Sequence, residues 1–145
     1  ICCILVKNKQ SMGRLIAIDH GEKRCGIAET DDLKIIASPL TTVPTPEIWT
    51  FLQQYLTKYK VDGIVVGEAK YLNGEASTTT LQQAAFVNEL QKKFPHFPVH
   101  RVDEMFTSSL ASKAILASGA SKKKRADKAL VDAVSAAIIL QQFLG

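Results

Sequence analysis

The stretch LIAIDHGEKRCGIA, residues 15–28, decides the fold that this sequence predicts. Four apolar residues run directly into Asp19, and Gly21 then marks a turn before a second apolar run begins. These patterns predict strands at 14–20 and 24–30, and the short link between them makes the two strands antiparallel. A carboxylate at the end of a buried strand is costly unless its charge has a partner, so Asp19 is the first candidate functional residue.

The bulk composition is that of a soluble globular protein. The chain has 145 residues, of which 46% are hydrophobic and 22% are charged. No apolar run approaches the roughly 20 residues that a membrane span requires, and the first segment is too short for a signal peptide. The 3 cysteines lack the spacing of a disulfide framework or a zinc site. These features predict a cytoplasmic protein that makes no membrane contact.

The N-terminal stretch fits poorly with the rest of the chain, and Met12 precedes the first clear strand. We interpret residues 1–11 as an N-terminal extension or upstream artefact, and residues 12–145 as a single domain. The net charge of +4 favours a polyanionic partner, and the only dense basic run is KKKR at 122–125. A solvated loop is the alternative interpretation of that run.

Strands and helices alternate through the rest of the chain. A third strand is predicted at 34–40, and Thr45, Pro46 and Glu47 predict the start of a helix capped by the threonine hydroxyl. The further predicted elements are strands at 61–68 and 99–104 and helices at 77–94, 107–118 and 127–143. Strands that are separated by helices pair in parallel through right-handed crossovers. The predicted fold is therefore α/β, a mixed five-stranded sheet with helices on both faces.

Acidic residues end three of the predicted strands. Asp19 ends the first, Glu68 the fourth, and Asp103 with Glu104 the fifth. If these strands are parallel, their carboxyl ends lie along one edge of the sheet, outside which open α/β folds bind their ligands. Alternation sends Asp103 to the opposite face from Glu104, and it sends His20 away from Asp19, which favours a structural role for His20.

The last predicted helix adds Asp132 to these acids. Ala129 and Ala136 share its helical face, and such small residues are expected to let the helix approach the sheet closely. No matching set of basic residues lies on the predicted strand ends. A divalent cation resolves the repulsion between the carboxylates, and hard oxygen ligands select Mg²⁺ or Mn²⁺.

Each acid also has an ordinary structural interpretation. In this interpretation Asp19 forms the turn before Gly21, and Glu68 is solvated at a loop. Asp132 would then pair with Lys128, four residues earlier in the chain. The joint placement of the acids on one predicted edge favours metal binding instead. Two such ions are a standard means of cleaving a phosphodiester bond.

Four segments resemble, in the same order, motifs of the RuvX/YqgF family, the pre-16S rRNA nucleases that are also described as Holliday junction resolvase-like. They are AIDHGEKRCGIA from residue 17, IVVGEAKYLNGEAS from 64, VDEMFTSSLAS from 102 and KALVDAVSAAIILQQFL from 128. The resemblance spans about residues 14–144. It implies an RNase H-like fold, with the strand order 3-2-1-4-5 and the second strand antiparallel.

By this resemblance, Asp19, Glu104 and Asp132 correspond to an acidic triad that is expected to hold catalytic Mg²⁺ or Mn²⁺. The chain departs from the family pattern at two positions. Met105 stands where the family usually has arginine, and Glu68 replaces the leucine of a Gly-Leu-Pro segment. Glu68 is therefore a candidate fourth metal ligand, and the neighbouring Asp103 is a further candidate.

The resemblance implies a metal-dependent endonuclease that acts on structured RNA and processes the pre-16S rRNA end during ribosome biogenesis, with ribosomal particles as a possible partner. The alternatives are a non-catalytic ribosome-assembly or junction-binding module and a Holliday junction resolvase acting on DNA. Monomer and homodimer both stay open. The candidate nucleic-acid contacts are Lys23, Arg24, Lys122, Lys123, Lys124 and Arg125, with Thr107 and Ser108 as further donors that alternatively cap the next helix.

Overall fold

A five-stranded mixed sheet forms the centre of the fold. Its strands are β1 (Arg14–His20), β2 (Arg24–Thr30), β3 (Ala37–Pro44), β4 (Val61–Glu68) and β5 (Val99–Asp103). They lie in the order β3-β2-β1-β4-β5. Strand β2 is antiparallel to both of its neighbours, whereas β1, β4 and β5 are parallel to one another. The predicted strand order and orientations are confirmed.

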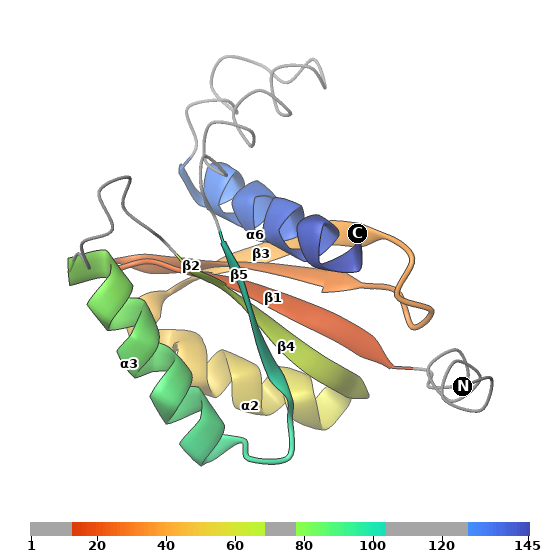
Figure 1. Cartoon of the computed structure of the whole chain (residues 1–145), viewed down its shortest axis with the longest axis horizontal. Coiled ribbons are helices and arrows are strands. Elements are labelled where there is room, and N and C mark those ends of the chain that lie inside the picture. Colours follow the sequence, from red (N-terminus) through yellow and green to blue (C-terminus); the bar gives the residue numbers. More distant parts are fainter. Residues whose placement is uncertain (1–12, 69–77, 104–127) are drawn as a thin grey trace.

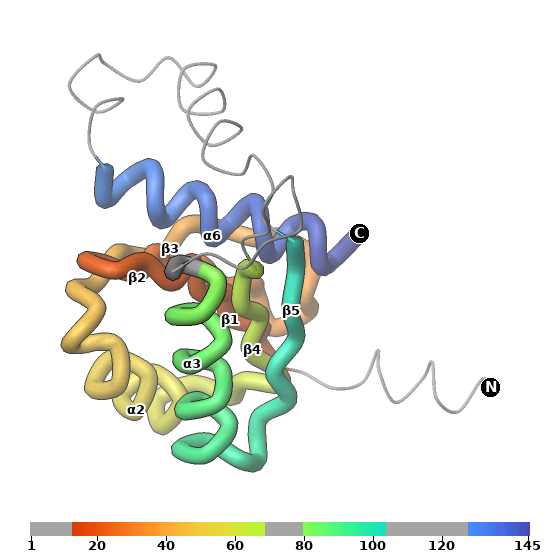
Figure 2. Tube along the Cα trace, turned by 60° about the vertical axis from the view of Figure 1, so that its left-hand side comes forward, coloured from red at the N-terminus to blue at the C-terminus, as the bar shows by residue number. Residues whose placement is uncertain are grey.

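Helices cover both faces of this sheet in the computed structural model, which describes residues 13–68, 78–103 and 128–145. The helices are α2 (Ile48–Lys58), α3 (Thr78–Lys93) and α6 (Lys128–Leu144), and a 3-10 turn, η1 (Thr45–Glu47), precedes α2. Helix α6 lies on one face, and α2 and α3 lie on the other (Figures 1 and 2). Within the described ranges, no helix is long and apolar enough to cross a membrane. The extension at 1–11 and the helix predicted at 107–118 lie outside these ranges.

The side chains of β1 alternate between two separate apolar layers. Ile16 and Ile18 are fully buried in the cluster beneath α2 and α3, whereas Leu15 and Ala17 are buried in the cluster beneath α6. We call these two sides the α2/α3 face and the α6 face. Because successive strand residues point to opposite sides, Asp19 belongs to the α6 face and His20 to the α2/α3 face.

Strand β3 begins three residues later than predicted, at Ala37 instead of Lys34. The carboxylate of Asp31 accepts hydrogen bonds from the backbone amides of Leu33, Ile35 and Ile36 at 2.8–3.1 Å, and Lys34 has a positive φ of 57°. These hydrogen bonds also lower the pKa of Asp31. The segment therefore wraps around a carboxylate, as in an Asx turn, and its amides are not free to pair with β2.

The prediction that the Thr45 hydroxyl caps the helix after β3 is wrong. Thr45 opens η1, and no side-chain hydrogen bond caps either η1 or α2. Its hydroxyl instead donates to the carbonyl of Gly21 at 2.7 Å, and its backbone amide donates to the carbonyl of Lys23 at 3.1 Å. Thr45 thus fastens the start of the helical layer to the turn between β1 and β2.

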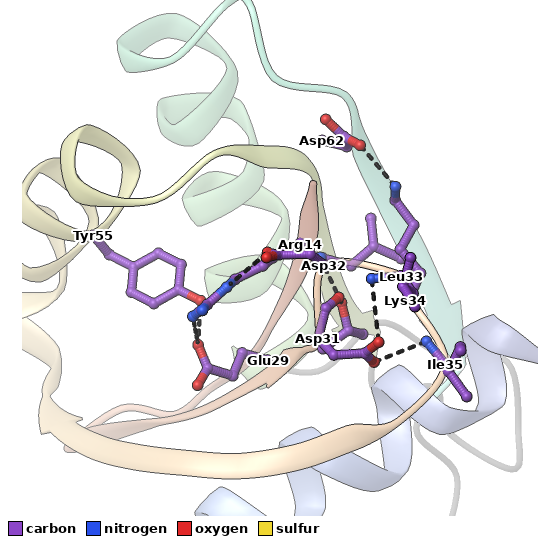
Figure 3. A network of polar contacts seen from close by, with 11 residues as sticks. Arg14, Glu29, Asp31, Asp32, Leu33, Lys34, Ile35, Tyr55 and Asp62 are labelled. Atoms are coloured by element: carbon purple, nitrogen blue, oxygen red, sulfur yellow. Dashed lines mark hydrogen bonds and ion pairs between the residues drawn. The ribbon is translucent and has the colours of Figure 1, made fainter. Parts of the chain in front are cut away.

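A polar network ties α2 to the amino end of β1 (Figure 3). The Arg14 guanidinium lies 3.0 Å from the Glu29 carboxylate and 3.3 Å from that of Asp32, and it stacks over the Tyr59 ring at 4.1 Å. The hydroxyl of Tyr55 donates to Glu29, and burial together with this contact raises the pKa of Tyr55. The network lies at the opposite end of β1 from Asp19.

Helix α6 approaches the sheet most closely at Gly26 of β2. A Cβ atom built on Gly26 would overlap the carbonyl group of Asp132 and would lie 3.0 Å from the amide nitrogen of Ala133. The first turn of the helix is also tied to β3, because the Thr42 hydroxyl donates to the Ala129 carbonyl at 2.6 Å. A glycine within a strand marks such a close approach of two backbones.

Replacing Gly26 by alanine should lower the free energy of unfolding by about 1–3 kcal/mol, because the added methyl group must displace the α6 backbone. Gly63→Ala is the matched control on β4. Its added Cβ would meet the tip of Leu15 at 3.2 Å and the His100 ring at 3.6 Å, and side-chain ends can move. Urea denaturation of both variants measures the difference. Equal losses for the two variants would contradict the assigned role of Gly26.

Candidate metal and nucleic-acid site

Asp19 and Asp132 come together on the α6 face, at the carboxyl end of β1. In the sheet register, Asp19 lies opposite Gly26, and Gly26 lies opposite Thr42 of β3. The backbone of Asp132 rests against Gly26, so it lies one strand away from Asp19. Paired residues on antiparallel strands have Cα atoms about 4.5–5.5 Å apart, which is the spacing expected between Asp19 and Gly26. Both side chains are partly exposed.

The charges of both carboxylates affect the pKa of the buried Cys25 thiol. Burial raises the pKa of Cys25, and the negative charges of Asp19 and Asp132 act in the same direction. The thiol itself is fully buried in the cluster of the α2/α3 face, where its Sγ atom lies 3.6 Å from the Thr45 hydroxyl. Two carboxylates therefore contribute to the electrostatic potential at one point of β2, and Cys25 is a core residue.

Asp132 is paired with Arg24, a basic partner at the start of β2 that the sequence analysis did not identify. The Arg24 Nε atom lies 2.5 Å from Asp132 Oδ2, and the two side chains are 34% and 27% exposed. Arg24 begins β2, two residues before Gly26, so it projects from the same face of the strand. The alternative partner, Lys128, is exposed at the first position of α6. The positive charge of Arg24 therefore neutralises one of the two carboxylates, that of Asp132.

Two further candidate ligands, Glu68 and Asp103, lie on the opposite face. Glu68 and Asp103 are paired in the parallel register of β4 and β5. Ile64 and Val66 pack into the α2/α3 cluster, so alternation directs Glu68 to that face, and the register gives Asp103 the same side. Asp103 is exposed and Glu68 is partly exposed. In the described parts of the chain, no three acidic, histidine or cysteine side chains are grouped closely enough to hold a metal ion.

His20 packs into the α2/α3 layer, as its expected structural role requires. Its ring stacks on Phe86 of α3, with centroids 4.4 Å apart and an interplanar angle of 27°. Burial lowers the pKa of His20. Beside it opens a pocket of about 400 Å³, lined by His20, Glu22, Thr45, Ile48, Trp49, Gln82, Ala85 and Phe86.

The remaining predicted site residues divide into two groups. Lys23 is exposed in the turn between β1 and β2, next to the paired Arg24. Glu104 and the predicted nucleic-acid contacts Thr107, Ser108, Lys122, Lys123, Lys124 and Arg125 lie outside the described residues.

Two features of the site were missed by sequence reasoning. The close approach of α6 was ascribed to Ala129 and Ala136, but Ala129 is exposed, and only Ala136 is buried against the sheet. The approach depends instead on Gly26. A glycine inside a predicted strand often marks a close approach of another backbone, and this could have indicated its role. The pairing of Arg24 with Asp132 joins residues 108 positions apart, and no local spacing indicates it.

Comparisons with known proteins show the family to which the chain is similar. The model of the RuvX family, described as Holliday junction resolvase, matches residues 13–145. A protein of Christiangramia forsetii named "Putative pre-16S rRNA nuclease" is 50% identical over 133 residues, covering 92% of this chain and 98% of the relative. A protein of the same name from Phocaeicola vulgatus is also 50% identical and covers 92% and 96% of the two chains.

A solved structure shares the fold. T. thermophilus RuvC, determined in complex with a Holliday junction substrate, superposes with a TM-score of 0.54 at 15% identity, covering 92% of this chain and 96% of RuvC. The sheet order β3-β2-β1-β4-β5 is that of this RNase H-like fold. With a family match over nearly the whole chain and relatives at 50% identity, this protein belongs to the RuvX family.

Proposed function

We propose that the protein is a metal-dependent endonuclease that cleaves structured RNA, and that its substrate is the precursor end of 16S rRNA. The observation that supports this proposal is the contact of the Asp132 backbone with Gly26, the residue that lies opposite Asp19 in the sheet register. Asp19 and Asp132 are partly exposed carboxylates from opposite ends of the chain, and Asp132 is held in its ion pair with Arg24. Their placement suits the binding of a cation.

The donor set fits Mg²⁺ or Mn²⁺. Asp19 and Asp132 supply hard carboxylate oxygens, the ligand type that these ions prefer. Glu104 is the proposed third ligand, because Val102, two residues before it, packs into the cluster beneath α6. Glu68 and Asp103 are weaker candidates, since alternation directs them to the other face. When bound, the ion supplies Lewis-acid activation of water and neutralises charge at the leaving oxygen.

The protein's own side chains prepare this site for an anionic strand. Arg24 neutralises Asp132 and can turn to a phosphate when a cation takes its place at the carboxylate. Lys23 is exposed beside it, and the run Lys122–Arg125 precedes the helix that carries Asp132. We propose that these basic groups contact phosphates of the substrate, and that binding therefore weakens with salt. The cytoplasm, where precursor rRNA and ribosomal particles occur, is the proposed compartment.

RNA is the proposed substrate because the relatives at 50% identity bear the name of a pre-16S rRNA nuclease. A four-way DNA junction is the second candidate, favoured by the description of the family. Incubation of the protein with labelled precursor rRNA and with a DNA junction, each with Mg²⁺ and with EDTA, separates the two. Cleavage of the junction alone would replace the RNA proposal, and cleavage of neither substrate would favour a binding module.

Asp19→Asn should abolish the metal site without unfolding the protein. The substitution keeps the shape of the side chain and removes one of two neighbouring charges, so the metal-free variant should be as stable as the wild type or more stable. Mn²⁺ should raise the melting temperature of the wild type but not of the variant. Cleavage should fall by orders of magnitude, while RNA binding persists.

Asp32→Asn serves as the control for Asp19→Asn, because Asp32 lies beside Arg14 at the other end of the sheet. It should retain both the Mn²⁺ response and the cleavage rate. A destabilised but fully active Asp19→Asn protein would show that Asp19 is a turn former and would overturn its assignment as a ligand.

Arg24→Ala should tighten Mn²⁺ binding by about two- to fivefold, because a partly exposed ion pair that competes with the cation contributes up to about 1 kcal/mol. Lys23→Ala is the matched control. It removes the same charge from the adjacent position, whose exposed side chain forms no ion pair with an acid in the described parts of the chain, and should change the affinity by less than twofold. Isothermal titration of both variants measures the difference. Equal effects would mean that Arg24 acts only through net charge.

A further inference from the structure

The pocket beside His20 lies outside the carboxylate site and has no assigned role. It opens at the carboxyl end of β1 on the α2/α3 face, between the turn after β1, the start of α2 and the first half of α3. We propose that this pocket binds one unpaired base of the nucleic-acid strand whose backbone is cleaved on the α6 face. The proposal rests on the proposed nuclease function and adds a substrate feature, an unstacked nucleotide, to it.

Aromatic rings form the walls of the pocket. Trp49 and Phe86 lie with ring centroids 5.1 Å apart at 31°, and His20 stacks on Phe86 from the side of the sheet. Trp49 is only partly buried, so part of its ring is exposed to solvent at the pocket. An exposed aromatic face is the feature by which proteins hold single-stranded bases, because every base presents a π surface. A volume of about 400 Å³ is within the range of small-molecule sites and accommodates a nucleobase.

Polar groups line the same pocket at positions where a base edge could bind. Gln82 of α3 offers an amide that both donates and accepts hydrogen bonds, and Glu22 offers a carboxylate that accepts them. The carboxylate also argues against a phosphate as the occupant, because the two negative charges would repel each other. The cations lie outside the pocket: Lys93 reaches the Trp49 ring at 5.3 Å, and Lys23 comes after Glu22 in the exposed turn. This pattern suits a base within the pocket and phosphates at its rim.

The position of the pocket connects it to the cleavage site. His20 lines the pocket, and Asp19, the proposed metal ligand, is the preceding residue on the same strand. Their Cα atoms are about 3.8 Å apart, and their side chains point to opposite faces. A strand that crosses the end of β1 would therefore present a phosphate to Asp19 and a neighbouring base to the pocket. Gln83 links α3 to this end of β1, because its side-chain amide donates to the His20 carbonyl at 3.4 Å.

The test uses the single tryptophan of the chain, Trp49, as its reporter. The full-length protein is titrated in EDTA with a short single-stranded RNA, with an abasic ribose-phosphate strand of equal length, and with a nucleoside monophosphate. Binding of a base against Trp49 should quench its fluorescence with the RNA. The abasic strand should bind more weakly by about 5- to 100-fold and leave the fluorescence unchanged.

Two neighbouring alanines of α3 provide matched variants. Ala85 lines the pocket, whereas Ala84 is exposed on the same turn and does not line it. Ala85→Leu should fill part of the pocket and weaken RNA binding by about tenfold with loss of quenching, and Ala84→Leu should leave both unchanged. Leucine is a good helix former, so both variants should fold, and their melting temperatures verify this.

The results distinguish a failure of the pocket proposal from a failure of the nuclease proposal. Equal quenching by the RNA and the abasic strand, or equal behaviour of the two leucine variants, would overturn the pocket proposal even if the protein cleaves RNA. Quenching by the monophosphate as strong as that by the RNA would assign the pocket to a free nucleotide and would also overturn it. If the pocket binds RNA bases in EDTA but no substrate is cleaved with Mg²⁺, the nuclease proposal fails and the base site stands.

Discussion

The contact between the α6 backbone and Gly26 is the constraint on which the rest of the site depends. Any side chain at this position would hold the helix away from β2, because a Cβ atom already overlaps the Asp132 carbonyl. With the helix seated, the row Thr42, Gly26 and Asp19 crosses three strands directly beneath its first turns. A carboxylate from the last helix and one from the first strand then share a single electrostatic environment. The alanines of α6 complete the fit, since Ala133, Ala136 and Ala137 are buried.

Most of the fold can be derived from patterns that the sequence shows directly. The apolar runs of β1 and β4 are buried on both sides, as central strands of a helix-covered sheet require, and the intervening helices oblige them to run parallel. The errors occur where side chains compete for backbone groups. The Asp31 carboxylate takes amides that β3 would have used, and the Thr45 hydroxyl bonds the Gly21 carbonyl instead of capping a helix. Residue propensities describe local preferences and do not include such partners.

The candidate site was less predictable than the fold, for a related reason. The position of Asp19 could be predicted because a charge that ends a buried strand is conspicuous in a linear pattern. Alternation also separated Asp19 from His20 correctly, as the stacking of His20 on Phe86 shows. The partner of Asp132 could not be predicted, since Arg24 reaches it only after the sheet forms and the helix docks. An ion pair between distant parts of a chain is a consequence of packing and leaves no trace in spacing.

The two proposals together assign different kinds of recognition to the two faces of the sheet at the end of β1. Because Asp19 and His20 are consecutive residues of β1 and both pair with β2, the pleat of the strand sets the spacing between the proposed metal site and the pocket. A substrate that fills both must bend its backbone across the strand end with one base turned out. Paired RNA or DNA resists this conformation, whereas an unpaired nucleotide adopts it at little cost. The two proposals together predict cleavage beside unpaired nucleotides, and this selectivity would arise from the alternation of side chains along β1.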